Sequence, residues 1–397
     1  MHQIDLDLLQ TAAVAVISLF VGLKIKNHFE FMNKYCIPST VVGGIVVSIF
    51  LSLFYIITGY KIPLDDTIEH LFMIIFFTSI GFQVNLFVLR HILRPLVVMV
   101  ICITFCIIMQ NMVVLSVAYF NLSDPYLAIT AGPITMMGGE GLAKIYGPIL
   151  QDLNLEHGIS LTRGMATLGL IIGALLGGPL GRFLILKHKL RPDPKVLEGF
   201  LPRRKDKEPD NSRVFERIAR AFYQLIIAMG VGITIYQLLK QSGIVIPMYI
   251  STMVSAIVIK NMFKSSKHFE IEVREITYLG GLALSLFLGI AFAELELYNL
   301  LMLKPIQLVL LILQLAVVVV FALCIFKFSG KNYDAAILSG ASLGFGIGAT
   351  PSSISSIITL NGKYGYSVVA FLLVPIAGTI IADPINSLII EFVIKLL

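Results

Sequence analysis

The sequence predicts an all-α polytopic membrane protein made of two inverted repeats of five transmembrane helices, each with a re-entrant loop between its fourth and fifth helix. Three observations lead to this prediction: the composition is strongly apolar, the apolar residues fall in runs of membrane-spanning length, and landmarks of the first half recur in the second. Of the 397 residues, 57% are hydrophobic and only 14% are charged, whereas about one-quarter of a soluble domain is charged. Lipid is therefore the expected solvent for most of the chain, whose mean hydropathy is +0.89.

Ten apolar runs approach the ~20 residues that cross about 30 Å of hydrocarbon. The acidic start, MHQIDLDLL, lacks the basic first segment and the cleavage site of a signal peptide, so the first run is expected to stay in the mature protein. The predicted spans are centred near Val14, Val47, Phe76, Phe105 and Ile172 in the first half, and near Ala228, Val254, Leu286, Val317 and Leu373 in the second.

The two halves repeat each other in order and at nearly constant displacement. An odd number of spans in each copy makes the second copy cross in the opposite sense, which is an inverted-repeat transporter architecture. We therefore expect a first repeat over residues 1–186, a linker over 187–212 and a second repeat over 213–397. The matching landmarks are Ile37-Pro38 and Ile246-Pro247, Ile80-Gly81 and Leu288-Gly289, Leu93-Arg94-Pro95 and Leu303-Lys304-Pro305, Gly132 and Gly340, and Pro179 and Pro384.

The charges of the loops predict the orientation. The net charge of +6 comes largely from basic residues in short loops, where they favour the cytoplasmic side of a membrane rather than binding to a nucleic acid. The linker and the loops after the first and third spans are expected in the cytoplasm, and both termini outside. The basic loops carry Lys24, Lys26, Lys34, Arg90, His91 and Arg94, and the acidic, external loops carry Asp65-Asp66, Asp124 and Glu294 to Glu296.

Two apolar stretches, within residues 125–150 and 333–360, are too rich in Gly, Pro, Ser and Thr for ordinary lipid-facing helices. The span count requires each to enter and leave the membrane on one side. Irregular backbone at that depth is tolerated only around a protein-lined or wet cavity, so these re-entrant loops predict a binding site. Close packing of helices through small residues is the alternative. A dinucleotide-binding loop at GFGIGA is disfavoured because no strand precedes it.

Candidate ligands are polar groups and glycines in these loops and inside the spans. Glycines let backbone amides approach a ligand, helix N-termini attract carboxylates, and a carboxylate within a span usually faces a cavity. The alternatives are that Asp383 faces external water and that the hydroxyls and amides bond neighbouring helices. The substrate candidates are Thr135, Gly138, Gly139, Glu140, Gly141, Ser285, Gly346, Gly348, Thr350, Pro351 and Ser352, and the sodium candidates are Asp383, Asn386, Asn111, Thr78 and Ser79.

A charged group follows the first loop: Glu140, Lys144 and Arg163 either pair with one another near the outer surface or contact a zwitterionic substrate. The histidines and cysteines lack metal-ligand spacing, and no GxSxG elbow or Walker lysine motif occurs. We therefore expect neither an enzyme nor an ATP-driven pump, and no cofactor. The cysteines are interpreted as small apolar packing residues: Cys36, Cys102, Cys106 and Cys324.

The stretch GKNYDAAILSGASLGFGIGATPSSIS closely resembles the bacterial sodium:glutamate symporter family. Further signatures are MQN from Met109, FFTSIGF from Phe76, LSLFL from Leu284, GGPLGR from Gly177, and FLLVPIAG followed by Asp383 and Asn386. The resemblance implies sodium-coupled uptake of L-glutamate across the bacterial plasma (inner) membrane, with Na+ as the coupling ion, an elevator-like alternating-access movement and a homodimer.

The first loop departs from the family pattern, because relatives carry Gly-Gly-His-Gly where this chain has Glu140 after Gly138-Gly139. This departure leaves other interpretations open. One is a sodium- or proton-coupled carrier of another organic anion such as a dicarboxylate, and a more distant one is a channel.

Overall fold

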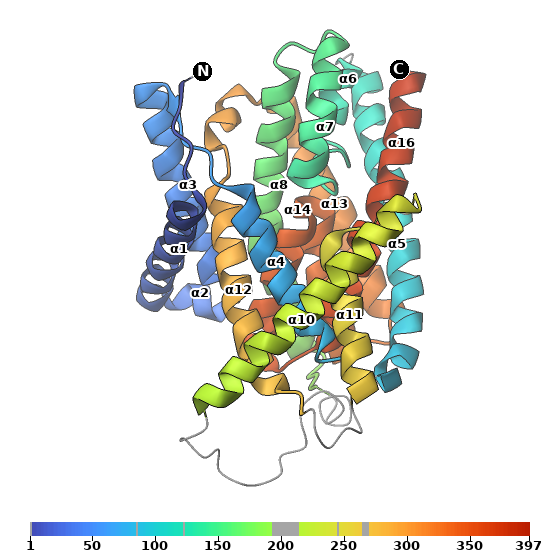
Figure 1. Ribbon diagram of the computed structural model, residues 1–397. Helices are drawn as coiled ribbons and strands as arrows, with labels where there is room; N and C mark the ends of the chain where they lie inside the picture. Colours follow the sequence, from blue (N-terminus) through green and yellow to red (C-terminus); the bar gives the residue numbers. More distant parts are fainter. Residues whose placement is uncertain (1, 85, 122–123, 193–213, 244–245, 264–269) are drawn as a thin grey trace. The chain divides into compact units, whose positions relative to one another are not determined.

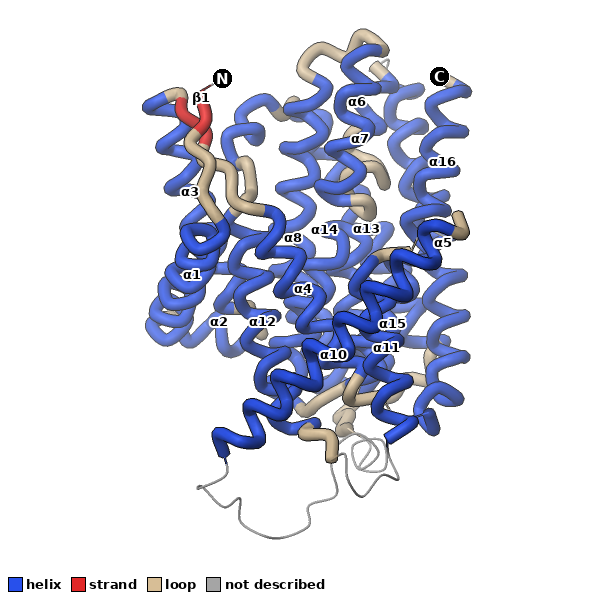
Figure 2. Tube along the Cα trace, viewed as in Figure 1, coloured by secondary structure: helices blue, strands red, loops and turns tan. Residues whose placement is uncertain are grey.

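The computed structural model describes residues 2–84, 86–121, 124–192, 214–243, 246–263 and 270–397, and in these ranges the chain is almost wholly helical (Figures 1 and 2). Nine helical stretches in the described ranges are long and apolar enough to cross a membrane. Two short strands, β1 (His2–Gln3) and β2 (Tyr60–Lys61), pair in parallel. The prediction of an all-α polytopic membrane protein is confirmed. The predicted linker, 187–212, lies mostly outside the described residues.

Every predicted span centre lies within a helix. A proline marks the start of three of these helices. Pro38 directly precedes the second predicted span, Pro247 precedes the seventh, and Pro305 is the first residue of the ninth. A proline at the first position of a helix costs nothing, because the N–H that it lacks would have no partner there. The helices are α1 (Leu8–His28), α3 (Ser39–Thr58), α4 (Asp66–Gly81), α5 (Leu86–Asn121), α8 (Gly158–Lys187), α10 (Val214–Gln241), α11 (Met248–Phe263), α12 (Val273–Ala293), α13 (Pro305–Phe328) and α15 (Val368–Pro375).

Several helices expose large apolar side chains that would be unfavourable in water. On α13, Ile312 is 68% exposed and Val320 is 58% exposed, and on α3 Ile57 is 80% exposed. Burying such groups stabilises a structure by about 25 cal/mol per Å² of apolar surface removed from water. Hydrocarbon around these helix faces keeps their apolar side chains out of water, as expected for a chain embedded in lipid.

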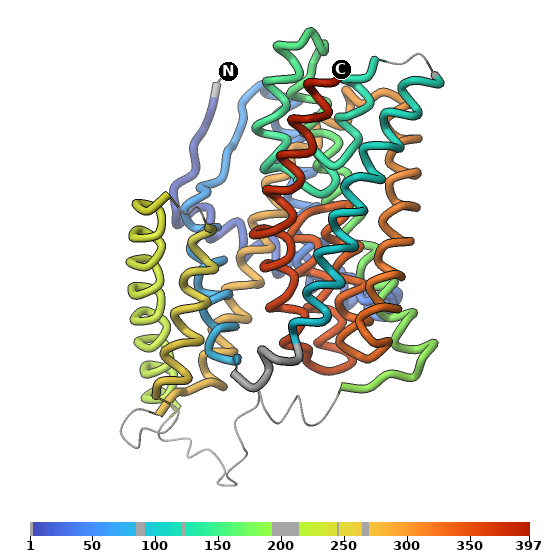
Figure 3. The backbone as a smooth tube through the Cα atoms, turned by 90° about the vertical axis from the view of Figure 1, so that its right-hand side faces the viewer, coloured from blue at the N-terminus to red at the C-terminus, as the bar shows by residue number. Residues whose placement is uncertain are grey.

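The chain divides into two compact units. The large unit comprises Met1–Leu64, Arg94–Arg191 and Leu288–Leu397, and its N- and C-terminal ends lie at the same end of the unit (Figures 1 and 3). The small unit comprises Asp65–Leu93 and Pro192–Phe287, and contains α4, α10, α11 and the first part of α12. Its core is a cluster of Phe82, Ala221, Leu225, Ala228, Ala256 and Ile276.

Within each unit, a helix of the first half of the chain packs on a helix of the second half. In the large unit, Gly44 of α3 packs against Phe292 at the end of α12, and Ser48 Oγ donates to Leu295 O at 2.6 Å. In the small unit, Gly81 of α4 packs against the Met253 carbonyl of α11. The third span of each half therefore packs on the second span of the other half.

The 32-residue helix α14 (Tyr333–Tyr364) is a hairpin, which we call the second hairpin. Its backbone leaves helical geometry at Gly348 (φ −139°, ψ 22°) and Ala349 (φ 59°, ψ −166°). Residues 12 apart in a straight helix would lie about 18 Å apart, yet Ser353 Oγ donates to Ala341 O at 2.7 Å. At its two ends, Tyr333 Oη donates to Gly365 O. The chain therefore reverses at the break, and α14 is not one straight helix.

Residues 125–152, the first hairpin, form α6 (Pro125–Ile129), a series of turns and α7 (Gly139–Asp152). Both sides of it contact one turn of α16 (Asp383–Leu396). Asn386 Nδ2 donates to Pro133 O at 2.9 Å before the turn, and Tyr146 Oη donates to Ser387 O at 3.4 Å after it. The chain therefore runs past this turn of α16, reverses near Gly138 and runs back past the same turn.

Helix α8 supports the second hairpin through a row of glycines spaced four residues apart. A Cβ on Gly173 would lie 2.8 Å from Gly344 O and 3.1 Å from Gly348 N, and one on Gly177 would lie 2.6 Å from Gly340 O. The small-residue packing considered as an alternative thus does occur, and it holds the broken backbone in place. Gly344 itself lies against the backbone of Ser352 in the opposite arm.

Candidate functional site

The two hairpin tips meet. Gly139, at the first position of α7, has φ +56°, and a Cβ placed on it would lie 2.6 Å from Ala349 Cβ at the break of the second hairpin. A side chain at residue 139 would clash at this junction, and L-residues rarely adopt such a φ. The predicted tips, Thr135 to Gly141 and Gly346 to Ser353, are therefore brought together within the large unit.

Two helix N-termini lie at this junction. One is the start of α7 at Gly139, and the other is the start of the second arm of α14, just after Ala349. The first N–H groups of a helix have no intrahelical partner, and the helix dipole places partial positive charge there. A pair of such ends creates a favourable place for carboxylate groups.

The polar residues of the second tip are held by backbone contacts. Ser352 Oγ donates to Leu170 O of α8 at 2.7 Å, and Gln110 Nε2 of α5 donates to Gly346 O at 2.9 Å. Thr350 and Pro351 are half-buried between them. The tip is thus rigidly supported from two helices. At the first tip, Thr135 is fully buried and its hydroxyl donates to Thr130 O at 2.6 Å.

Buried amides surround the tips, and several of their oxygens have no hydrogen-bond donor among the described residues. Asn386 is fully buried; its nitrogen bonds the first hairpin while its Oδ1 is unsatisfied. The same holds for Gln110 Oε1 and for Gln314 Oε1, whose Nε2 donates to Gln110 O at 2.9 Å. Asn111 Nδ2 donates to Ile107 O within α5 at 3.0 Å. Unsatisfied amide oxygens are suitable ligands for a hard cation.

Asp383 is half-buried at the first position of α16. It directly follows η3 (Ile376–Ala382), a π-helical segment after Pro375. Such segments are rare and occur often at functional sites, because the register change frees backbone carbonyls. The sequence predicted Asp383 as a candidate ligand, but not the π-helical geometry beside it.

Three of the predicted site residues belong to the small unit. Thr78 and Ser79 are buried, and their hydroxyls bond carbonyls of their own helix at 2.7 Å and 2.6 Å. Ser285 Oγ donates to Gly281 O at 3.0 Å. Those bonds follow the alternative reading, in which hydroxyls satisfy helix backbones, and the candidate roles of these residues stay predictions.

Glu140, Lys144 and Arg163 line one cavity of the large unit, together with Thr167, Glu294 and Glu296. The sequence grouped the first three residues correctly but assigned different partners. Lys144 Nζ lies 3.8 Å from Glu294 Oε1, and Arg163 Nη1 donates to both Glu296 oxygens, at 2.9 and 3.1 Å. We call this space, of about 20 Å³, the charged cavity.

Glu296 is the centre of this charge network. Besides Arg163, Lys61 pairs with it, and Asn299 Nδ2 donates to Glu296 Oε2 at 2.8 Å. These contacts connect α8 to the segment between α12 and η2 (Leu297–Met302), where Gly164 of α8 also packs against Asn299 O. The acidic residues Glu294 and Glu296 therefore pair with basic residues from the first half of the chain.

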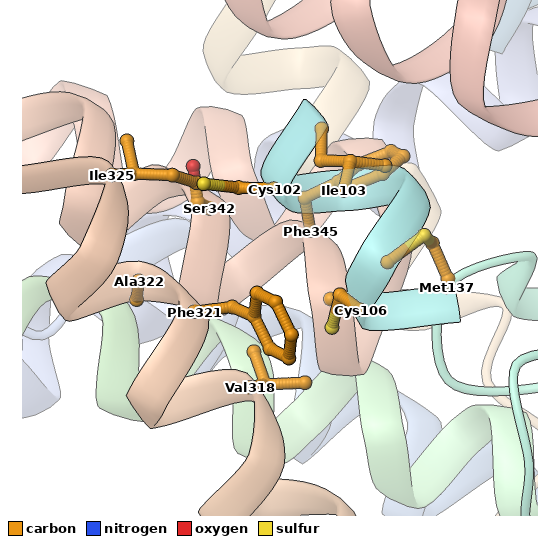
Figure 4. A pocket seen from close by; sticks show the side chains of 11 residues that line it. Cys102, Ile103, Cys106, Met137, Val318, Phe321, Ala322, Ile325, Ser342 and Phe345 are labelled. Carbon is orange, nitrogen blue, oxygen red and sulfur yellow. The ribbon is translucent and has the colours of Figure 1, made fainter. Parts of the chain in front are cut away.

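A second, apolar cavity of about 10 Å³ lies between α5, α13 and the two hairpins (Figure 4). Its lining is sulfur-rich and aromatic, and includes Cys102, Cys106, Met137, Phe321 and Phe345. This volume is below that of an organic substrate and close to the smallest that holds one water. The cysteines are free and three of the four are buried, in keeping with a packing role.

Comparison with known proteins identifies the family. Residues 4–366 match the family described as sodium/glutamate symporter. The chain is 29% identical over 395 residues to the sodium/glutamate symporter of Escherichia coli (strain K12), covering 98% of both chains. It is also 29% identical over 395 residues to that of Haemophilus influenzae, covering 96% of both chains. The resemblance carried by the glycine-rich second tip is thereby confirmed, and the chain belongs to the sodium/glutamate symporter family.

Proposed function

We propose that this protein is a secondary active transporter that takes up L-glutamate together with sodium across the bacterial plasma membrane. Family membership supports this function, and the relatives are named as symporters, not enzymes. One structural observation carries it: the N-termini of α7 and of the second arm of α14 meet at Gly139 and Ala349. That arrangement suits a small substrate with more than one carboxylate.

In this proposal the substrate lies at the junction of the tips. Backbone N–H groups at Gly139 and Gly141 and around Thr350 and Ser352 face its carboxylates, and Gly138 and Gly348 give the backbone access. Pro351 lacks an N–H and instead fixes the start of its helical arm. Gly346, whose carbonyl accepts from Gln110 Nε2, lies two residues before the break, near the end of the opposite arm.

Sodium lies beside the substrate, held by oxygen atoms of Asp383, Asn386 and Asn111 and by freed carbonyls. The unsatisfied Asn386 Oδ1 supports this assignment. An inward-negative potential contributes about 2.3 kcal/mol per elementary charge per 100 mV. Glutamate is a net anion, so at least two sodium ions must accompany it if this potential is to drive uptake.

The proposed architecture is the inverted repeat. The order of four spans, a hairpin and a fifth span occurs twice in the chain, and the reciprocal packing of third spans on second spans supports a two-fold relation. Each hairpin is then a re-entrant loop, in repeats over 1–186 and 213–397. Alternating access is elevator-like, in a homodimer with both termini external and the linker cytoplasmic.

The function is tested by reconstituting the purified protein in proteoliposomes and measuring uptake of labelled L-glutamate. We expect accumulation under an inward sodium gradient and none when choline replaces sodium. Accumulation that follows only a proton gradient would contradict sodium coupling. Competition by unlabelled acids distinguishes a glutamate carrier from a carrier of another organic anion. If a dicarboxylate without an amino group inhibits uptake more strongly than unlabelled glutamate does, the substrate is a different acid.

Replacing Asp383 with alanine is expected to raise the sodium concentration that half-saturates uptake by about tenfold, because one charged ligand is lost. Glu391→Gln is the control, since Glu391 is an exposed carboxylate on the same helix. The measurement is the sodium dependence of initial glutamate uptake. Unchanged sodium dependence in the Asp383 variant removes this residue from the site.

A further inference from the structure

The charged cavity offers space for a small ion. Its volume of about 20 Å³ accommodates about one water-sized particle. Its polar lining is rich in oxygen, from three carboxylates and the hydroxyl of Thr167. Carboxylate and hydroxyl oxygens are the ligands that hard cations take.

Thr167 points independently to an occupant. This residue is 1% exposed, it lines the charged cavity, and its Oγ1 has no hydrogen-bond partner among the described residues. Threonine in a helix ordinarily bonds a carbonyl one turn earlier, as Thr162 on the same helix does, at 2.8 Å from Gly158 O. A buried hydroxyl without such a bond is costly unless a ligand contacts it.

The charges of the lining favour a monovalent cation. Arg163 is bonded to Glu296, and Lys144 lies near Glu294, whereas Glu140 takes part in neither pair. Three carboxylates and two cationic groups line the space, so its lining has one more acidic side chain than basic ones. Lys61 also bonds Glu296 but lines the neighbouring cavity with Tyr55 and Tyr298.

We propose that the charged cavity binds a coupling sodium ion through Glu140, Thr167 and Glu294. The inference rests on the proposed function and deepens it, since it places one of the sodium ions at a site separate from Asp383. Glu140 directly follows Gly139, which contacts Ala349 of the second hairpin. A sodium ion that draws the start of α7 toward α8 therefore fixes the junction of the two tips, and so couples ion binding to substrate binding.

Lys144 competes with the ion in this arrangement. Its ammonium lies 3.8 Å from Glu294 and its side chain is 51% exposed, so it can withdraw into solvent when sodium binds. Removal of a ligand and removal of this competitor should therefore change sodium affinity in opposite directions. A merely structural role of the cavity would not give opposite signs.

The test measures the melting temperature of the purified protein, without glutamate, as NaCl replaces choline chloride at constant ionic strength. We expect sodium to stabilise the wild type, as a ligand that binds only the folded state must. Glu140→Gln and Thr167→Val should each raise the half-saturating sodium concentration by about tenfold. Lys144→Gln should lower it.

Glu156→Gln is the control, because Glu156 is 84% exposed and pairs with the neighbouring His157 at 3.6 Å; it should match the wild type. Wild-type sodium affinity in both Glu140→Gln and Thr167→Val overturns the proposal, as does equal stabilisation by magnesium or potassium. If Glu140→Gln does not fold, Thr167→Val decides alone. Sodium binding is measured without substrate, so a failure of glutamate uptake in the wild type counts against the proposed function only.

Discussion

Replacing Gly173 with alanine is expected to reduce glutamate uptake by about tenfold or more, although it adds one methyl group. That methyl would lie 2.8 Å from Gly344 O and 3.1 Å from Gly348 N, both backbone atoms that cannot rotate away. Overpacking of this kind costs about 1–3 kcal/mol, and here it displaces the break that positions the second tip. The measurement is sodium-driven uptake per amount of reconstituted protein.

The control for Gly173→Ala is Gly362→Ala. Gly362 lies near the end of the second hairpin, and a Cβ there meets no atom within 4 Å, so uptake should equal that of the wild type. Wild-type uptake by Gly173→Ala would show that the close approach of α8 to the break has no part in transport.

The second large effect is expected from Glu296→Gln, which removes the carboxylate between Arg163 and Lys61. The three side chains are 18%, 32% and 25% exposed, respectively, so two half-buried cations lose their counter-charge. Loss of one partner from a fully buried pair costs about 3–5 kcal/mol, and partial exposure reduces this to roughly 1–3 kcal/mol. Thermal unfolding in detergent should show a lower melting temperature.

A double-mutant cycle isolates this interaction. If Arg163 and Glu296 are coupled, the variant that carries Glu296→Gln and Arg163→Gln should be more stable than the sum of the two single losses predicts. Additive losses would contradict the pairing. Glu156→Gln again serves as the surface control, because exposed pairs contribute little.

Much of the large-scale organisation followed from the sequence, because hydrocarbon imposes strong rules on it. Span length and apolar composition placed all ten helix centres, and glycine and proline content placed the hairpins. The tip predicted at Gly346 to Ser353 contains the observed break at Gly348 and Ala349. Only glycine-rich, proline-containing backbone departs from a helix so readily.

The pairing of distant side chains did not follow from the sequence. Glu296 and Arg163 are separated by 133 residues, and their contact depends on how η2 lies against α8, which no local pattern encodes. The acidic residues could be assigned only to a loop. Thr167 was missed for the same reason, since a threonine in an apolar helix gives no sign that its usual carbonyl bond is absent.

The amides that support the hairpins were partly detectable. Gln307 and Gln314 are fully buried on α13, and Gln307 Nε2 donates to Thr130 Oγ1 of the first hairpin at 2.6 Å. Two amides seven residues apart in an otherwise apolar span share one helix face, and polar groups in spans usually face protein. The seven-residue spacing of Gln307 and Gln314 is therefore a sequence pattern that indicates which face of α13 packs on the hairpins.

The central claim is that sodium and glutamate move together through this protein as one charged complex. The direct test uses proteoliposomes adsorbed on a solid-supported membrane. The measurement is the current evoked by adding L-glutamate, once in sodium buffer and once in choline buffer. We predict an inward positive current that requires sodium. A glutamate-evoked current of equal size in choline, or sodium-driven glutamate accumulation without any current, would contradict the claim.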